Sequence, residues 1–147
     1  ISFFSSRISA VKGEGMLLAS CHGAVACSDG DHQIRLSTQY VDVRLSWLTR
    51  LSLLMHEARH AEGWPHRRCP AGLRSFYLGA DLEGVEACDE AAVGAYGVQF
   101  VMLKNLEKFC QSCTGQERIE AGNFADALLK QVISAEAQQT LLSDLKF

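Results

Sequence analysis

The sequence predicts an α+β fold: a small N-terminal β-sheet followed by a histidine-bearing helix and a C-terminal helical part. In the first 40 residues, short apolar and β-branched runs alternate with glycine and polar turns, which indicates strands. From about residue 43 the apolar residues follow a three-and-four spacing, which is typical of helices with one buried face. With 147 residues, 48% of them hydrophobic, the chain is expected to form one domain over residues 1–147.

The N-terminal part is expected to contain short strands joined by turns. Residues 1–8 and 16–21 are apolar runs, and the glycines at 13–15 form a turn between them. Residues 27–31 contain polar residues and a glycine, which predicts a loop. Residues 33–40 alternate apolar and polar side chains, so we expect a half-exposed strand with one apolar face; the alternation fits an exposed edge strand and any other surface strand equally well.

Helices are expected over most of the remaining chain. The first covers residues 43–62 and ends there because Gly63 suits a helix C-terminus and Pro65 forbids continuation. The other segments are expected as a loop-rich stretch at 64–87 and helices at 89–108, 116–133 and 135–145, with a break near residue 122. Gly94 and Gly97 are costly inside a helix, which predicts a closely packed neighbour.

Charge and hydropathy exclude several classes of partner. A net charge of −3 gives no reason to expect a nucleic acid. No uninterrupted apolar run reaches about 18 residues, so we expect no membrane span. The chain begins at Ile1 rather than methionine, without a charged segment and apolar run ahead of it, so we expect a processed or excised fragment. The sequence leaves the oligomeric state open.

The six cysteines favour disulfides and therefore a secreted or periplasmic location. Six buried thiols in a cytosolic protein are the alternative. The expected disulfides join near neighbours in the sequence: Cys21 with Cys27, Cys69 with Cys88, and Cys110 with Cys113. The last pair forms a C-x-x-C motif that could instead be redox-active or bind metal, but no second such motif completes a four-thiolate zinc site.

The string HEARHAEGWPH, which begins at His56, contains three of the chain's five histidines. His60 lies four residues after His56, so both imidazoles project from one helix face and can meet one metal ion. Glu57 is placed to take a proton from a metal-bound water. If the helix stops at Gly63, His66 can swing back as a third ligand, and the fourth position stays open as in catalytic zinc sites.

This string matches H-E-x-x-H-x-x-G-x-x-H, so over these residues the chain resembles the metzincin branch of zinc metallopeptidases. The resemblance implies a compact zincin-like domain that hydrolyses a peptide or protein substrate, with Zn²⁺ held by the three histidines and Glu57 as general base. Metzincins carry a methionine turn after the third histidine, whereas Met102, the only downstream methionine, falls in a helical run. Residues 56–69 and 88–99 also resemble small exported bacterial proteins of unassigned activity.

Several roles around this string have more than one candidate. The segment CDEAAVGA resembles the second helix of gluzincin-type peptidases, which implies Glu90 as an alternative to His66 for the third ligand. Tyr96 is expected either to stabilise the oxyanion or to pack as an aromatic between helices. Asp89 or Glu62 could accept a hydrogen bond from a ligand imidazole, and the sequence does not choose between them.

Two other classes of function fit the same residues. One is a zinc-carrying domain outside the cytoplasm that does not hydrolyse peptides; a fourth protein ligand such as Cys69, Asp89 or Glu90 would indicate it. The other is a disulfide-stapled binding domain without a metal. The fourth coordination position distinguishes a catalytic zinc site from a structural one.

Overall fold

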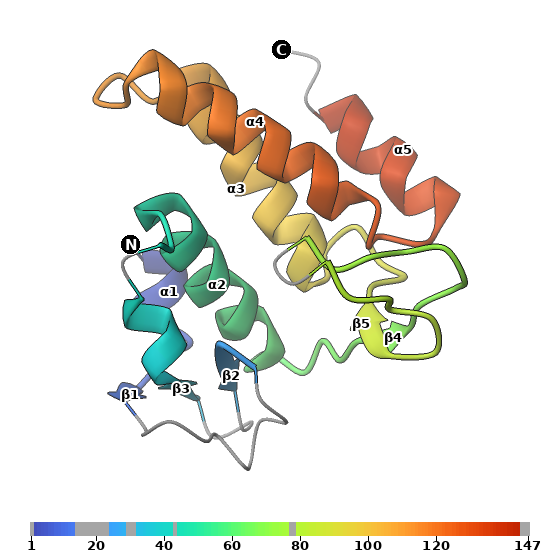
Figure 1. Cartoon of the computed structure of the whole chain (residues 1–147), viewed down its shortest axis with the longest axis horizontal. Coiled ribbons are helices and arrows are strands. Elements are labelled where there is room, and N and C mark those ends of the chain that lie inside the picture. Colours follow the sequence, from blue (N-terminus) through green and yellow to red (C-terminus); the bar gives the residue numbers. More distant parts are fainter. Residues whose placement is uncertain (1, 14–23, 29–31, 43, 77–78, 145–147) are drawn as a thin grey trace. The chain divides into compact units, whose positions relative to one another are not determined.

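The computed structural model describes residues 2–13, 24–28, 32–42, 44–76 and 79–144. Strands and helices are both present, so the predicted α+β class is confirmed (Figure 1). The chain divides into two compact units, Ile1–Trp64 and Pro65–Phe147. The expectation of a single domain over 1–147 stays a prediction. Within the described residues, no helix has both the length and the apolar character needed to cross a membrane.

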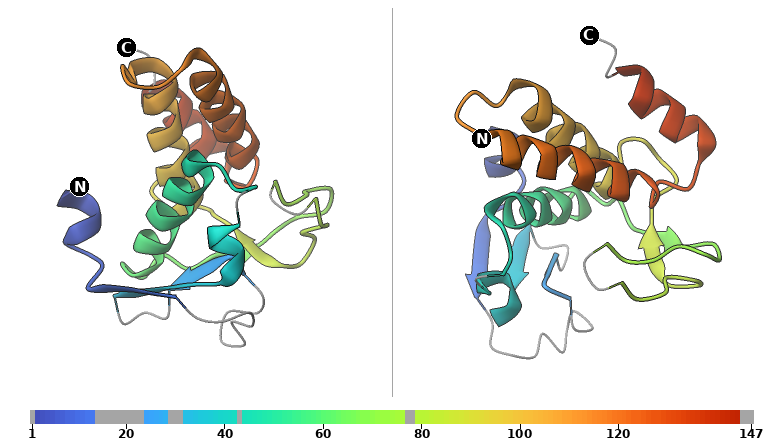
Figure 2. Two further views of the ribbon diagram at one scale, coloured as in Figure 1. Left: turned by 60° about the vertical axis from the view of Figure 1, so that its left-hand side comes forward. Right: turned by 45° about the horizontal axis from the view of Figure 1, so that its top comes forward.

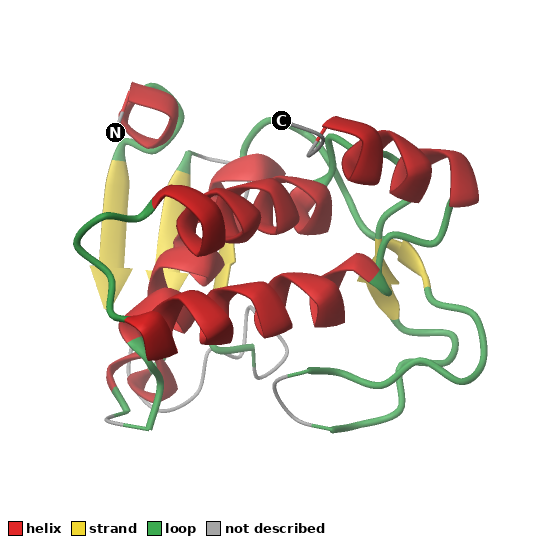
Figure 3. Cartoon of the chain, turned by 90° about the horizontal axis from the view of Figure 1, so that it is seen from above, coloured by secondary structure: helices red, strands yellow, loops and turns green. Residues whose placement is uncertain are grey.

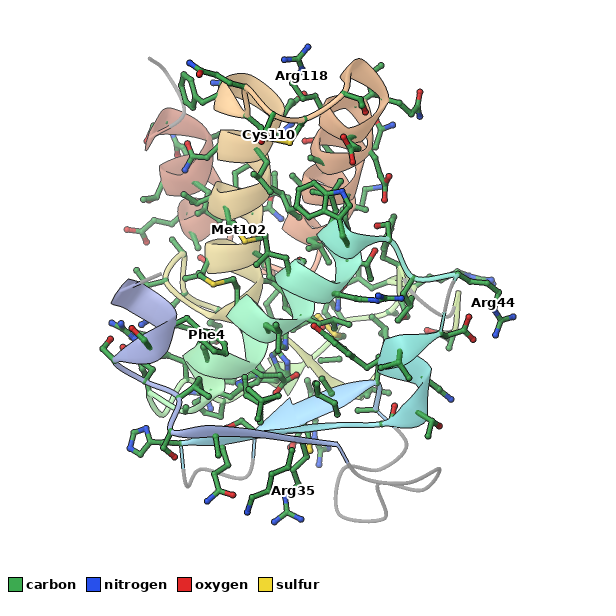
Figure 4. All side chains as sticks on the ribbon, turned by 90° about the vertical axis from the view of Figure 1, so that its left-hand side faces the viewer. Phe4, Arg35, Arg44, Met102, Cys110 and Arg118 are labelled. Carbon is green, nitrogen blue, oxygen red and sulfur yellow. A yellow bond between two sulfur atoms is a disulfide. The ribbon has the colours of Figure 1, made fainter. Side chains whose placement is uncertain are left out.

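The first unit contains a three-stranded sheet in the order β1-β3-β2. Its strands are β1 (Ala10–Gly13), β2 (Ala26–Ser28) and β3 (Gln33–Leu36). β3 lies in the middle, parallel to β1 and antiparallel to β2, so of the two readings of residues 33–40 the edge strand is excluded in the described sheet. The alternation itself is present, since Ile34 is buried and Arg35 points away from α2 (Figure 4). A central strand covered on one face shows the same pattern as an edge strand.

Two further sequence expectations for this unit are wrong. The described part of the strand predicted at 1–8, residues 2–8, does not form a strand, because Ser2–Ser5 is the short helix α1 and the N–H groups of Arg7 and Ile8 both donate to the Phe4 carbonyl. An apolar run becomes a strand only where the fold gives it a partner, so its propensity alone does not decide. The strand predicted at 33–40 also ends early, with Leu36, and a 3-10 helix, η2 (Thr38–Val41), follows.

Some of the predicted N-terminal elements lie outside the described residues. The strand expected at 16–21 and most of the turn at 13–15 lie outside the described residues. Of the loop expected at 27–31, Cys27 and Ser28 instead complete strand β2, and the other three residues lie outside the described ranges.

Helix α2 (Trp47–His60) packs on β2 and β3 (Figures 1 and 3). It begins later than predicted because the Ser46 side chain caps it, accepting a hydrogen bond from the Thr49 N–H. It ends at His60 rather than at residue 62, and Gly63 after it has the predicted left-handed conformation, with a φ of 83° and its N–H donating to the His60 carbonyl. The buried residues of α2 are Leu48, Thr49, Ser52, Leu53, His56, Glu57 and Ala58. His56 and Glu57 of the motif are therefore buried, whereas His60 is partly exposed.

The second unit begins with a small sheet and ends with three helices. Its elements are β4 (Arg67–Arg68), β5 (Glu86–Cys88), α3 (Ala95–Phe109), α4 (Gly115–Leu129) and α5 (Ala135–Asp144). Helices α3 and α4 pack side by side, and α5 contacts α3 (Figure 2). The helix expected from residue 89 begins only at Ala95, because residues 89–94 form the turn that caps it. Helix α4 has no break at Gly122, which packs against the Glu107 side chain.

Cysteines in the second unit pair as expected. Cys69 forms a disulfide with Cys88, and Cys110 forms one with Cys113 at the end of α3, where Figure 4 labels Cys110. In the first unit, Cys27 is also disulfide-bonded, whereas the partner predicted for it, Cys21, lies outside the described residues. No described cysteine is a free thiol, which excludes the reading of buried thiols for these positions.

Candidate metal centre

Two histidines of α2 face each other one helical turn apart. The Nε2 atoms of His56 and His60 are 3.0 Å apart, and the rings meet edge to face with centroids 4.7 Å apart. His56 is 7% exposed and belongs to the buried residues of α2. The predicted projection of both imidazoles from one face is therefore present, and both rings direct the same nitrogen at the other.

Hydrogen bonding fixes the tautomer of His60. Its Nδ1 lies 2.6 Å from the Trp64 carbonyl oxygen, which can only accept, so Nδ1 carries the proton and Nε2 keeps its lone pair. Side chains hold the turn that supplies this carbonyl: the Arg59 guanidinium lies 4.8 Å from the centroid of the Trp64 ring. Glu62 forms ion pairs with Arg59 and Arg7, so it is engaged with guanidinium groups and not with an imidazole.

His66 is held by the other carboxylate that the sequence singled out. Its Nδ1 lies 2.9 Å from Oδ1 of Asp89, which is only 3% exposed. The His66 ring stacks on that of Tyr96, with centroids 5.0 Å apart and an interplanar angle of 22°. Tyr96 is 7% exposed, so its ring is buried and packed, which agrees with the expectation of a packing role for this aromatic side chain. The oxyanion role of its phenol stays a prediction.

The predicted ligands come together. Each of His56, His60 and His66 offers a ring nitrogen, and these atoms lie within 4.8 Å of one another. Within the described ranges they are the one group of at least three histidine, cysteine or acidic residues that could hold a metal ion. Neutral imidazole suits zinc, copper, iron and nickel, so the donor set fits a transition metal without identifying it.

The other proposed ligands lie elsewhere. Glu90 does not belong to the group; it is exposed, and its carboxylate pairs with Arg67 at 3.3 Å. Cys69 is excluded as a fourth ligand because its sulfur is in a disulfide. Both carboxylate oxygens of Asp89 are already engaged: one lies within hydrogen-bond distance of Nδ1 of His66, and the other accepts a hydrogen bond from the backbone N–H of Tyr96.

Glu57 is buried beside the first ligand. It is 5% exposed and accepts a hydrogen bond from the backbone N–H of Ser28 in strand β2. Burial raises the pKa of this carboxyl to about 8, and the Ser28 hydrogen bond opposes that rise. Sequence reasoning did not find Ser28 or the Trp64 carbonyl, because a backbone group that binds a side chain leaves no residue-type signal.

In comparisons with known proteins, no family model, no curated protein and no solved structure matches the chain. What the residues themselves establish is a set of three histidines that could bind a metal ion, in an α+β chain with two disulfides among its described cysteines.

Proposed function

We propose that this chain is a zinc-dependent metallopeptidase in a zincin-like domain that acts on peptides or proteins outside the cytoplasm. The observation that carries the proposal is the convergence of three imidazole nitrogens from the H-E-x-x-H-x-x-G-x-x-H string. The extracytoplasmic location is supported by the disulfides, which persist in oxidising compartments.

Each residue has a role in this proposal. His56, His60 and His66 would hold the ion. Zinc, when bound, acts as a Lewis acid that polarises a carbonyl group and makes a coordinated water acidic. Glu57 would accept a proton at its carboxylate and return it to the leaving amine, as a general base and then a general acid. Tyr96 would stabilise the developing oxyanion through its phenol.

One observation favours a second function, a zinc-carrying domain without hydrolytic activity. His56 and Glu57 are both more than nine-tenths buried, whereas a peptidase must admit a peptide bond to the metal and the base. In a structural or regulatory zinc domain, the same burial would shield the ion. The two functions share the ligands and differ in whether Glu57 contributes to turnover.

The variant Glu57→Gln distinguishes them, because it keeps the side-chain shape and removes the base. We expect it to bind zinc as the unaltered protein does, measured by elemental analysis after dialysis. Cleavage of a quenched fluorescent peptide library should fall by a factor of about 10² to 10⁴. Glu86→Gln, at an exposed glutamate in β5, is the control and should leave both measurements unchanged.

Unreduced cleavage by Glu57→Gln would refute the peptidase mechanism. Zinc binding by the unaltered protein without cleavage of any library member would favour the zinc-carrying function. A protein that binds no zinc would exclude both.

A further inference from the structure

Both the side chain and the backbone of Asp89 are held by hydrogen bonds. Its Oδ1 lies 2.9 Å from Nδ1 of His66, and its Oδ2 accepts the backbone N–H of Tyr96 at 2.6 Å. Its own backbone N–H donates to the Gln131 carbonyl, and its carbonyl accepts from the Ile133 N–H, both at 2.8 Å. The carboxylate therefore has a set orientation, in which each oxygen has a different donor to satisfy.

The start of α3 is shaped around this carboxylate. Gly94, the N-cap of α3, has a φ of −67°, which any residue adopts, so a glycine is not needed there for its backbone conformation. A Cβ at Gly94 would instead lie 2.5 Å from Oδ2 of Asp89. The Tyr96 N–H belongs to the first turn of the helix, where backbone N–H groups have no partner within the helix, and Oδ2 of Asp89 supplies its acceptor.

We propose that Asp89 is a positioning residue that fixes His66 in the tautomer with its proton on Nδ1, so that Nε2 is the nitrogen offered to the metal. The proposal rests on the proposed zinc site. An ionised carboxylate can only accept hydrogen bonds, so the ring nitrogen opposite Oδ1 has to carry a proton. In the neutral ring the other nitrogen then keeps its lone pair. His60 reaches the same tautomer through the Trp64 carbonyl.

The variant Asp89→Asn is expected to invert this tautomer. An asparagine has one accepting oxygen and one donating amide group. The Tyr96 N–H requires an acceptor, so the amide oxygen takes the place of Oδ2 and the amide NH₂ faces His66. A donor opposite Nδ1 requires the lone pair there, which moves the ring proton to Nε2 and blocks the nitrogen meant for the metal.

The test uses the full chain with ¹⁵N-labelled histidine, stripped of metal and held at a pH of about 8, where an ordinary imidazole is neutral. Ring nitrogen chemical shifts report which nitrogen of His66 is protonated. We expect Nδ1–H in the unaltered protein and Nε2–H in Asp89→Asn. Zinc affinity, measured by competition with a chelating dye, should fall by a factor of about 10 to 100 in the variant.

Glu90→Gln is the matched control, since it removes the same charge one residue away from an exposed side chain that pairs with Arg67. It should change neither the tautomer nor the zinc affinity. An Nε2–H tautomer in the unaltered protein would overturn the proposal, as would an unchanged tautomer in folded Asp89→Asn. The first of these measurements needs no variant, so the proposal can be refuted even if Asp89→Asn does not fold.

The same experiment separates the two proposals. The His66 tautomer is read without metal and tests the action of Asp89 directly. If the unaltered protein bound no zinc at all, the metal centre itself would be refuted, whatever the tautomer.

Discussion

Replacing Gly94 with alanine is expected to displace the Asp89 carboxylate and destabilise the second unit. The new Cβ would lie 2.5 Å from Oδ2 and 2.7 Å from Cγ of Asp89. Ordinary van der Waals contact begins at 3.4 Å, so the carboxylate has to retreat by 3.4 − 2.5 = 0.9 Å. The backbone of Asp89 is tied to Gln131 and Ile133, so most of that movement falls on the side chain.

The magnitude follows from the contacts that such a movement breaks. The Tyr96 N–H donates to Oδ2 at 2.6 Å, and a hydrogen bond to a charged group contributes about 1.5–3 kcal/mol. Gly94 is also the N-cap of α3, where alanine is less favourable than glycine by up to about 1 kcal/mol. Together these effects predict a loss of about 2–4 kcal/mol in the free energy of unfolding.

Urea unfolding of metal-free protein, followed by far-UV circular dichroism, measures this loss. The control is Gly115→Ala at the first position of α4, where a Cβ meets no heavy atom of the described residues within 4 Å. Because alanine is the better helix former, this control should be stabilised by up to about 1 kcal/mol. If Gly94→Ala were as stable as the unaltered protein, the tight packing around Asp89 would be wrong.

Two further predictions concern the elements that hold the candidate site. Replacing both Cys69 and Cys88 by alanine should lower the free energy of unfolding by about 3 kcal/mol, and replacing both Cys110 and Cys113 should lower it by about 2 kcal/mol, because the second disulfide closes a much shorter loop. Urea unfolding of the two variants measures both losses, and equal losses would contradict the loop-length argument. Glu62→Gln removes the carboxylate that pairs with the guanidinium groups of Arg7 and Arg59, so the free energy of unfolding should fall by about 1–3 kcal/mol. An unchanged midpoint of thermal unfolding would show that these ion pairs do not contribute to stability.

Features with a local cause were predictable from the sequence. The spacing of His56 and His60 places both rings on one helix face wherever the helix lies in the fold. Gly63 adopts the left-handed conformation that commonly follows the last turn of a helix. This conformation depends on the residue type and its chain neighbours, so the sequence predicts it. The disulfides Cys69–Cys88 and Cys110–Cys113 also followed from near-neighbour spacing.

Features with a distant cause were not predictable. Strand order is decided by pairing between segments, so the alternation of residues 33–40 could not reveal that β3 is central. The choice between Asp89 and Glu62 as the partner of an imidazole depended on which carboxylate the fold brings to His66 and which to Arg7. Helix α3 begins at Ala95 because the Asp89 carboxylate caps it across a turn, and the helical spacing of residues 89–94 carried no sign of that contact.

The most direct test of the account is zinc X-ray absorption spectroscopy on protein loaded with one equivalent of zinc and dialysed. The account predicts one retained ion per chain, with three imidazole nitrogens at about 2.0–2.1 Å, and loss of one imidazole in His66→Ala. It would be contradicted if no zinc were retained, or if His66→Ala kept all imidazole ligands while Glu90→Gln lost a carboxylate ligand.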